Sequence, residues 1–348
     1  MSYTVTCADL NRDRAILLDI LTQNREKDYP YERRYDWIYL DNPWGKAVAW
    51  LIWDDKKQRP VGITAAFPRK ILVQGRELTC WNCGDFSIEK PYRTLGIAIK
   101  LRKAAREAVD RGEVPCLYAH PNNRMVHVHL KVGHRQIARM KRYALPLRPS
   151  KLVSGKSWRG VVSTLVDPPV ATLLRLKFRR AGDFELHPPE QFSFSPDHTN
   201  LCWELSEHFP VVGLRDENYL TWKYIRHPVH RFYLFNYYQK DRLAGYIVFR
   251  LEDGTAAVSE AVTGPEKEAW KQMLSTFLWA LLARFPAAKG VSVVTQEFNP
   301  LVETMLALGF KFRDDSTSAV IAHTADPDLQ PLVLEGKNWF MTVGDRDS

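Results

Sequence analysis

The sequence has few cysteines, and their arrangement suits neither a disulfide framework nor a zinc site. Five cysteines are scattered over 348 residues, whereas small secreted domains carry dense, even-numbered sets. Cys80 and Cys83 form a single CxxC pair, which lacks the second pair of a zinc site and does not open a helix as redox motifs do. We therefore expect Cys80 and Cys83 to be buried strand residues, and we expect no metal site.

The chain also lacks a signal-peptide-like start, a long apolar run and a basic arm. Residues 1–10 have no apolar core, and the longest apolar stretch, 277–285, contains Arg284 and is far shorter than a membrane-spanning helix. The net charge of +9 permits anionic partners, but the densest basic stretch, 135–151, is interleaved with apolar residues and is typical of strands with a solvated face. These features predict a soluble cytoplasmic protein with no membrane span and no dedicated nucleic-acid surface.

What the chain does contain is enough apolar material for two domains. Hydrophobic residues make up 45% of the chain and charged residues 26%, which is a globular composition, and 348 residues exceed the usual size of one core. Eleven tryptophans and fourteen tyrosines fit large cores and an interface between two similar halves.

A short pattern occurs twice in the chain with identical spacing. Trp-x-Tyr-x-x-x-Pro begins at Trp37 and again at Trp222. Each copy then reaches a glycine inside an apolar strand-like run, and each ends with an asparagine ten residues before a glycine (Gly62, Asn123 and Gly133; Gly245, Asn299 and Gly309). One supersecondary unit is therefore repeated. Its aromatic residues are expected in the core of each unit or in the cleft between the units.

Hydrophobic periodicity predicts the same order of elements in both copies. In the first copy it predicts three strands, a long helix, a strand, a helix and a strand, at about 47–54, 60–73, 77–88, 94–111, 114–119, 123–132 and 134–145. We predict an α/β fold of the mixed α+β kind, with two tandem domains at 1–148 and 201–348, each a mixed, mostly antiparallel sheet flanked by helices. Residues 149–200 are expected to form a proline-rich connector with one helix. The C-terminal segment from Thr324 onward, called the tail below, contains Trp339 and Phe340, which indicate that it packs back on the molecule.

The turn before the long helix of the first copy is basic. Helix N-termini carry unpaired N–H groups and a partial positive charge, so acidic residues are typical there. This turn instead contains Lys90 and Arg93, and Gly96 and Ala98 would let a ligand approach the backbone. The pattern indicates a bound anion, and an ordinary basic surface turn is the alternative.

The corresponding turn of the second copy has the opposite character. Pro265 is followed by Glu266 and Glu268, and Thr263 stands in a capping position. This helix is expected to satisfy its own terminus and to exclude an anion.

Residues 92–98, Tyr-Arg-Thr-Leu-Gly-Ile-Ala, resemble the Arg/Gln-x-x-Gly-x-Gly/Ala pyrophosphate loop of GNAT-type acyl-CoA N-acyltransferases. The segment from Asn123 to Gly133 looks like the later Asn…Gly-Phe segment of that family, with His134 in place of the phenylalanine. The resemblance covers about 30–145, and 215–323 by the logic of the repeat. It implies tandem GNAT domains, of which the first binds acetyl-CoA or another acyl-CoA and the second is degenerate at the cofactor site.

The resemblance also implies which residues would hold the cofactor. Backbone amides of 93–98 would bind the pyrophosphate, and the backbone N–H groups around Ile88 would polarise the acyl carbonyl. The candidate cofactor-binding residues are Ile88, Arg93, Thr94, Leu95, Gly96, Ile97, Ala98 and Asn123.

Two residues are candidates for proton transfer. Strand alternation places Cys83, Asp85 and Ser87 on one face, and Asp85 is the preferred general base, directly or through water, although it could instead cap a neighbouring element. His129 stands where the family often has a tyrosine that protonates the leaving thiolate, so it is the candidate acid. His127, His129 and His134 could be metal ligands, but solvent-facing or core histidines are favoured over that reading.

Three functions fit these observations. The preferred one is acyl-CoA-dependent N-acyl transfer, with acetyl transfer to an amine on a small molecule or sugar by direct attack on the thioester. The second is a peptidoglycan-type transferase that uses aminoacyl-tRNA, and the third is a non-catalytic binding protein. The loop from Arg93 to Ala98 favours acyl-CoA, since a tRNA donor would not need it. The identity of the acceptor, the acyl chain length and the oligomeric state stay open.

Overall fold

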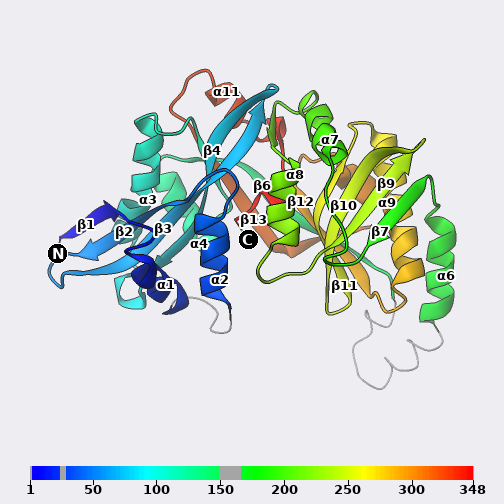
Figure 1. Cartoon of the computed structure of the whole chain (residues 1–348), viewed down its shortest axis with the longest axis horizontal. Helices are drawn as coiled ribbons and strands as arrows, with labels where there is room; N and C mark the ends of the chain where they lie inside the picture. The colour runs from blue at the N-terminus through cyan, green and yellow to red at the C-terminus, as the bar shows by residue number, and fades with distance from the viewer. Residues whose placement is uncertain (1, 24–28, 149–165, 348) are drawn as a thin grey trace.

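The computed structural model describes residues 2–23, 29–148 and 166–347. We call 2–148 the first half and 166–347 the second half. Their strands join in one sheet, in the order β1-β2-β3-β4-β5-β13-β6-β12-β11-β10-β9-β7 (Figure 1). Strand β8 pairs in addition with β3, and β14 pairs with β8. The mixed sheet flanked by helices confirms the predicted fold class.

The first half contains the elements that the periodicity predicted. In chain order they are β1 (Tyr3–Cys7), α1 (Arg14–Gln23), α2 (Tyr31–Tyr35), the π-helical turn η1 (Asp36–Leu40), β2 (Val48–Asp54), β3 (Arg59–Val73), β4 (Arg76–Ile88), the 3₁₀ turn η2 (Lys90–Tyr92), α3 (Leu95–Asp110), β5 (Leu117–Ala119), α4 (Asn123–Lys131) and β6 (Arg135–Pro146). Apolar residues of α3 at helical spacing pack against one face of the sheet, and α1 and α2 cover the other face.

The second half repeats this order after an additional segment. Its elements are α6 (Asp167–Lys177), β7 (Asp183–His187), α7 (Pro196–Ser206), β8 (Val211–Gly213), α8 (Glu217–Leu220), the π-helical turn η4 (Thr221–Ile225), β9 (Tyr233–Gln239), β10 (Arg242–Glu252), β11 (Thr255–Thr263), α9 (Lys267–Arg284), β12 (Gly290–Gln296), α10 (Leu301–Leu308), β13 (Lys311–His323), α11 (Gln330–Val333), the 3₁₀ turns η5 (Gly336–Asn338) and η6 (Val343–Asp345), and β14 (Trp339–Phe340).

The stretch expected as a connector contains more structure than its one predicted helix. Residues 149–165 lie outside the described residues, and α6 begins at Asp167. Strand β7 then pairs with β9 at the sheet edge, and α7 buries Leu201 and Leu205 in the core of the second half. Short, proline-flanked elements of this kind carry little periodic signal. The predicted domain limits themselves stay a prediction.

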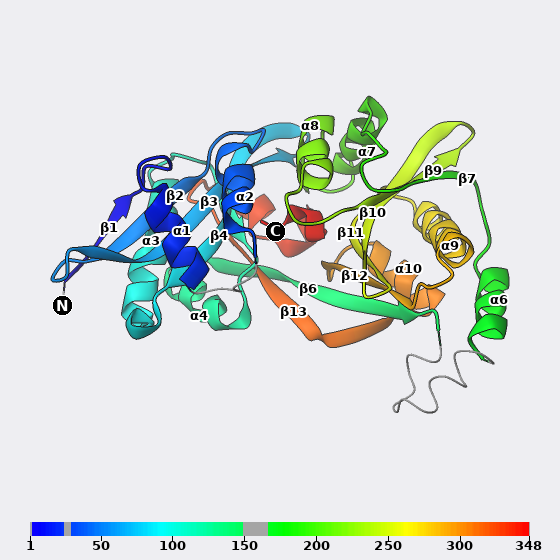
Figure 2. The ribbon, with the colours of Figure 1, turned by 60° about the horizontal axis from the view of Figure 1, so that its bottom comes forward.

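The two halves exchange their last strands. The first half ends with β6, which pairs with β12 of the second half, and the second half supplies β13, which pairs with β5 of the first half and with β6 (Figure 2). Each half therefore completes the sheet of the other.

The repeated tryptophans contact each other across the two halves. Trp37 and Trp222 stack with their ring centroids 4.5 Å apart. The indole N–H of each donates to the backbone carbonyl of the other, at 3.0 Å in both directions. The predicted aromatic repeat thus lies buried between the halves.

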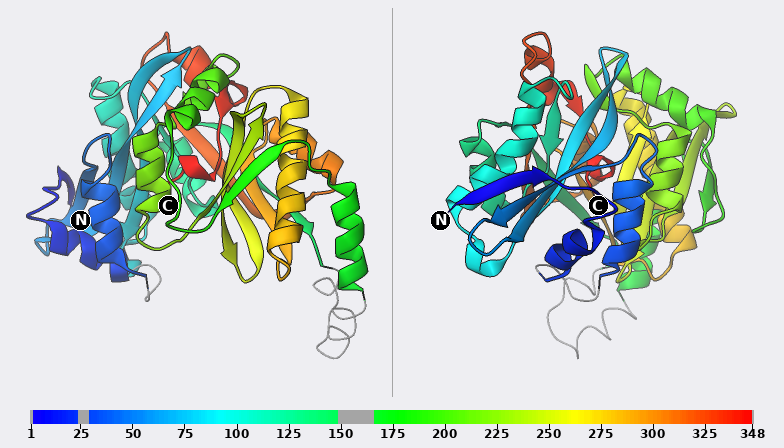
Figure 3. Two further views of the ribbon diagram at one scale, coloured as in Figure 1. Left: turned by 45° about the vertical axis from the view of Figure 1, so that its right-hand side comes forward. Right: turned by 60° about the vertical axis from the view of Figure 1, so that its left-hand side comes forward.

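The tail and the strand cysteines are buried as expected. Trp339 is 1% exposed and Phe340 is fully buried, and the following residues run between the two halves (Figure 3). Cys80 and Cys83 are buried in β4. Within the described ranges, none of the helices combines the length and apolarity needed to cross a membrane.

Candidate functional site

A cleft opens in the first half where two parallel strands separate. Strand β4 pairs with β5 only from Trp81 to Cys83 and then continues to Ile88, while the chain after β5 turns into α4. The amide of Glu89 donates to Val61 on β3 at 3.0 Å. Because alternate residues of a strand direct their backbone groups to opposite edges, the N–H of Ile88 faces the open side.

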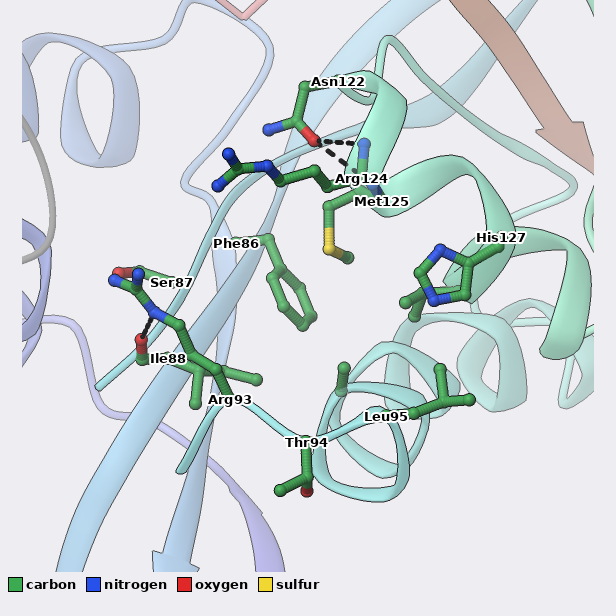
Figure 4. Close-up of a pocket in the computed structure, with 12 residues that line it drawn as sticks. Phe86, Ser87, Ile88, Arg93, Thr94, Leu95, Asn122, Arg124, Met125 and His127 are labelled. Carbon is green, nitrogen blue, oxygen red and sulfur yellow. Dashed lines mark hydrogen bonds between the residues drawn. The ribbon is translucent and has the colours of Figure 1, made fainter. Parts of the chain in front are cut away.

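This cleft holds a cavity of about 360 Å³. Its walls come from the end of β4, the turn into α3 and the start of α4, with Phe86 in the middle of the view in Figure 4. The lining residues are Phe86, Ser87, Ile88, Arg93, Thr94, Leu95, Ala98, Asn122, Arg124, Met125, His127 and Val128.

The start of α3 offers unpaired donors to this cavity. Thr94 is the N-cap residue, but its side chain makes no capping hydrogen bond, and the first turn contains no acid. The first amides of a helix have no partner within the helix, so those of residues 95–97 are available to a ligand. A methyl group added at Gly96 would meet nothing within 4 Å, so the backbone there is open. The Arg93 Nε donates to the carbonyl of Ile88 at 2.9 Å, which holds this cation at the cavity wall (Figure 4).

Five of the eight predicted cofactor-binding residues line the cavity, namely Ile88, Arg93, Thr94, Leu95 and Ala98. Gly96 is exposed beside it, and Ile97 is buried in the core under α3. Asn123 is exposed and does not line the cavity, whereas Asn122 does. Asn122 also caps α4 by accepting from the amides of Arg124 and Met125 at 3.1 and 3.2 Å.

The lining residues that the sequence reasoning missed come mostly from α4. Arg124, His127 and Val128 lie at helical i, i+3 and i+4 spacing and therefore share one face. That spacing was visible in the sequence, but it did not show which side of α4 faces the cleft. Phe86 lies two residues before Ile88, so strand alternation puts both on one face, and this signal was present in the sequence.

Asp85 lies at this break and faces away from the cavity. Its φ of 45° and the register shift between β3 and β4 mark a β-bulge. The predicted face was therefore wrong in one respect: Cys83 packs with Ile88 in the core under α3, on the opposite side from Asp85. The Asp85 carboxylate accepts from Arg34 at 2.6 Å and from the Tyr39 hydroxyl at 2.9 Å.

Arg34, the ion-pair partner of Asp85, is held in its charged form. Burial opposes the charge of Arg34, but the carboxylates of Asp85 and Asp347 raise the pKa of its guanidinium. Arg34 also donates to the backbone carbonyl of Asp347 at 3.1 Å. Asp85 is thus part of a buried ion pair next to the tail, and its role as general base stays a prediction.

His129 is buried outside the cavity. Its Nδ1 lies 3.0 Å from the Nδ1 of His134, and burial lowers the pKa of both rings well below the usual value, so both are neutral near pH 7. His127 is exposed and lines the cavity. Across the residues that the structure describes, no group of three or more His, Cys, Asp or Glu side chains is placed to hold a metal ion. The role of His129 as an acid stays a prediction.

In the second half, the equivalent separation of strands is occupied by the tail. Strands β11 and β12 pair only as far as Val258 and Val293. Beyond this point, the carbonyl of Met341 accepts from Thr295 Oγ1 at 3.1 Å and from Asn299 Nδ2 at 3.4 Å. The Thr342 hydroxyl donates to Glu260 at 2.6 Å.

The start of α9 also differs from the sequence expectation. Thr263 does not cap this helix, because its hydroxyl donates to the carbonyl of Ala244 at 2.6 Å. Glu266 is the N-cap residue, without a capping bond from its side chain, and Glu268 lies in the first turn. Negative charge is therefore present at the N-terminus of α9, as predicted, although the side chain of the N-cap residue makes no capping hydrogen bond there.

A buried carboxylate of the tail joins the two halves. Asp345 lies 3.0 Å from Arg69 of the first half and 2.7 Å from Arg215 of the second half. Its backbone carbonyl accepts from Asn82 at 3.1 Å and Tyr118 at 2.8 Å. Burial opposes ionisation, but Arg215 and Arg69 together lower the pKa of Asp345 to about 2.

Comparison with known proteins identifies the fold. No protein-family model and no curated protein matches the sequence. Among solved structures, a GCN5-related N-acetyltransferase from Anabaena variabilis ATCC 29413 is 16% identical, covers 93% of this chain and 73% of that chain, and has a TM-score of 0.66. A conserved protein of unknown function from Enterococcus faecalis V583, described as a probable N-acyltransferase, is 12% identical with coverages of 93% and 73% and a TM-score of 0.65.

A third similar structure is a GCN5-related N-acetyltransferase from Kribbella flavida, at 12% identity, coverages of 92% and 72%, and a TM-score of 0.60. At such identities the similarity is one of fold. The chain therefore has the fold of the GCN5-related N-acetyltransferases, which confirms the fold that the loop at 92–98 implied.

Proposed function

We propose that this protein is an acyl-CoA-dependent N-acyltransferase whose first half binds the CoA thioester in the cavity between β4, α3 and α4. The amine of a small-molecule or sugar acceptor would attack the thioester carbonyl directly, with acetyl transfer as the simplest case. The second half would be a degenerate copy, since the tail fills its equivalent site.

The observation that carries this proposal is the uncapped start of α3 beside Arg93. A diphosphate is a suitable ligand for free helix N-terminal amides, because it accepts hydrogen bonds and its negative charge meets the positive end of the helix dipole. The open backbone at Gly96 permits close approach. Arg124 and His127 on α4 face the same cavity and add positive or polar groups on the opposite wall.

The inner part of the cavity suits the thioester arm. Phe86 and Met125 offer apolar surface to the arm, while the N–H of Ile88, which faces the open side of β4, is a donor for a carbonyl oxygen. In this arrangement the chain's own residues would bind the diphosphate at one end and orient the reactive carbonyl against β4 at the other.

Calorimetric titration with acetyl-CoA and desulfo-CoA tests the site. We expect binding in the micromolar range and its loss in Gly96→Trp, because an indole would cover the free amides without disturbing a packed neighbour. The matched control is Glu268→Trp at the second helical position of α9, which should bind normally. Absence of CoA binding by the unaltered chain would overturn the proposal.

Release of free CoA thiol with a panel of amines tests the reaction itself. Asp85→Asn and His129→Gln are the variants for the two proton-transfer roles. A loss of kcat with unchanged CoA affinity, measured under conditions in which the variant is still fully folded, would support a role in the chemical step. Unchanged kcat in either variant would remove that residue from the proposed mechanism.

A further inference from the structure

Arg102 is a buried arginine without a carboxylate partner. It lies on α3 at 1% exposure, donates to the Thr64 hydroxyl, and has no hydrogen-bond partner for its Nε. Among the residues that the structure describes, the other buried arginines are Arg34, Arg69 and Arg215, and each pairs with a carboxylate. For Arg102, no carboxylate of the described ranges lies within ion-pair distance.

A buried arginine without a carboxylate partner lowers the stability of the folded protein. A buried guanidinium does not lose its proton, and an isolated charge in a protein interior is strongly unfavourable unless an anion compensates it. The Thr64 hydroxyl, the Cys83 thiol and the Phe86 ring all contact the guanidinium, and none of them carries a compensating negative charge. This arrangement is explained if the anion arrives with a ligand.

The guanidinium lies directly behind the inner wall of the cavity. Ala98, one helical turn earlier on α3, lines the cavity, and long helical side chains lean toward the N-terminal turn. Phe86 both lines the cavity and packs against Arg102, whose guanidinium carbon is 5.8 Å from the ring centroid. A shift of the Phe86 ring would bring a ligand group into contact with Arg102.

The position of Arg102 selects which part of a ligand would reach it. Residue 102 is seven positions along α3 from residue 95, a rise of about 10 Å from the helix start. The diphosphate would occupy that helix start, beside Arg93. The group that reaches Arg102 is therefore at the opposite, acyl end of the thioester.

We propose that the site prefers an acyl-CoA whose acyl chain ends in a carboxylate, such as a succinyl or glutaryl thioester, with Arg102 as the receptor for that carboxylate. This inference rests on the proposed function. The carboxylate would accept hydrogen bonds from the guanidinium of Arg102. Charge-assisted hydrogen bonds of this kind are short and strong, and arginine suits carboxylates by its planar fork.

The test compares CoA, butyryl-CoA and succinyl-CoA by calorimetry, because the last two acyl chains have equal length and differ in the terminal charge. The unaltered chain should bind succinyl-CoA at least about tenfold more tightly than butyryl-CoA. Arg102→Met should abolish this preference and leave the affinity for CoA itself unchanged. Arg102→Lys, which keeps the charge but loses the fork, should retain a weaker preference.

The outcomes separate this inference from the function on which it rests. CoA binding with equal affinities for the two thioesters would overturn the carboxylate preference and leave the acyl-CoA site intact. Failure to bind any of the three ligands would overturn both. Folding provides an independent check: Arg102→Met should melt no lower than the unaltered chain, because it removes an unpaired charge, whereas Arg69→Met, which leaves Asp345 short of a partner, should melt lower.

Discussion

At Asp85 the chain enters a bulge and buries a carboxylate against Arg34. The side chains of this pair are 0% and 5% exposed. We expect Asp85→Asn to lower the free energy of unfolding by about 3 kcal/mol, because removal of one partner leaves a buried charge uncompensated. Urea denaturation measures the change. Asp36→Asn is the control, since Asp36 pairs with Arg14 at half-exposed positions and should cost less than about 1 kcal/mol. Equal effects for the two variants would contradict the buried pairing.

The pair formed by His129 of α4 and His134, which directly precedes β6, predicts that acid lowers the stability of the folded chain. Burial lowers the pKa of His129 and His134 in the folded chain, whereas in the unfolded chain each titrates near 6.5. Their contribution is fully present above pH 6.5. As the pH falls below that value, the unfolded chain gains protons that the folded chain does not accept, so stability decreases by up to about 1.4 kcal/mol per pH unit for each histidine.

Denaturation curves between pH 4.5 and 7.5 measure this slope. The double variant His129→Leu with His134→Phe should be less sensitive to acid, and its stability near pH 7 should change little because both partners of the hydrogen bond are removed together. His127→Gln, at an exposed position, should keep the original slope. An unchanged slope in the double variant would show that other groups cause the acid sensitivity.

At the scale of the element, the start of α3 has free amides, which can bind an anion but leave the helix less stable than a capped one. Thr94 occupies the N-cap position without a capping bond. We expect Thr94→Asp to raise the free energy of unfolding by about 0.5–1 kcal/mol, because a carboxylate would accept from the free amides and favour the helix dipole. The same carboxylate should weaken CoA binding, because it competes with the diphosphate for those amides.

Thermal denaturation and calorimetry of the same samples check the two opposite effects. Glu266→Asp at the N-cap of α9 is the matched variant, because its side chain also makes no capping bond. It should stabilise the chain without altering CoA binding. A gain of CoA affinity in Thr94→Asp would contradict the placement of the anion at this helix.

The elements and the open turn before α3 could be predicted because their signals are local. The helical spacing of apolar residues marked α3, and the turn at 74–75 matches a two-residue hairpin, with φ of 48° at Gln74 and 73° at Gly75. The loop from Arg93 to Ala98 lies between one strand and one helix, so a short stretch of sequence carries it. Most of its predicted lining residues do face the cavity.

The parts that could not be predicted depend on contacts between distant segments. The spacing of residues in α4 does not show that the face with Arg124 lines the cleft, because the position of this helix depends on where β4 and β5 separate. The bulge at Asp85 inserts one residue and reverses the alternation on which the face assignment rested. Arg102 reads as one of several basic residues on an amphipathic helix, and only the packing shows that it is buried without an anion.

At the scale of the whole molecule, the exchange of β6 and β13 makes the halves interdependent. Backbone pairing of β13 with β5, and of β6 with β12, places strands of each half inside the sheet of the other. The tail adds side-chain contacts to this arrangement, since residues 343–347 bond to both halves. The molecule should therefore unfold as one unit, although its sequence is a repeat.

Asp345 is the residue at which this coupling can be tested. Its carboxylate compensates Arg69 of the first half and Arg215 of the second, so Asp345→Asn should cost about 3–5 kcal/mol, as is typical for a broken buried ion pair. Amide hydrogen exchange should show lost protection in β3 and β4 together with β10 and β11. Asp328→Asn, at an exposed position of the same tail, should leave both sets unchanged. Loss of protection confined to β10 and β11 would mean that the tail belongs to the second half alone. Because the carboxylate is shared across the halves and both arginines stay charged, we expect both sets of strands to lose protection to a similar degree.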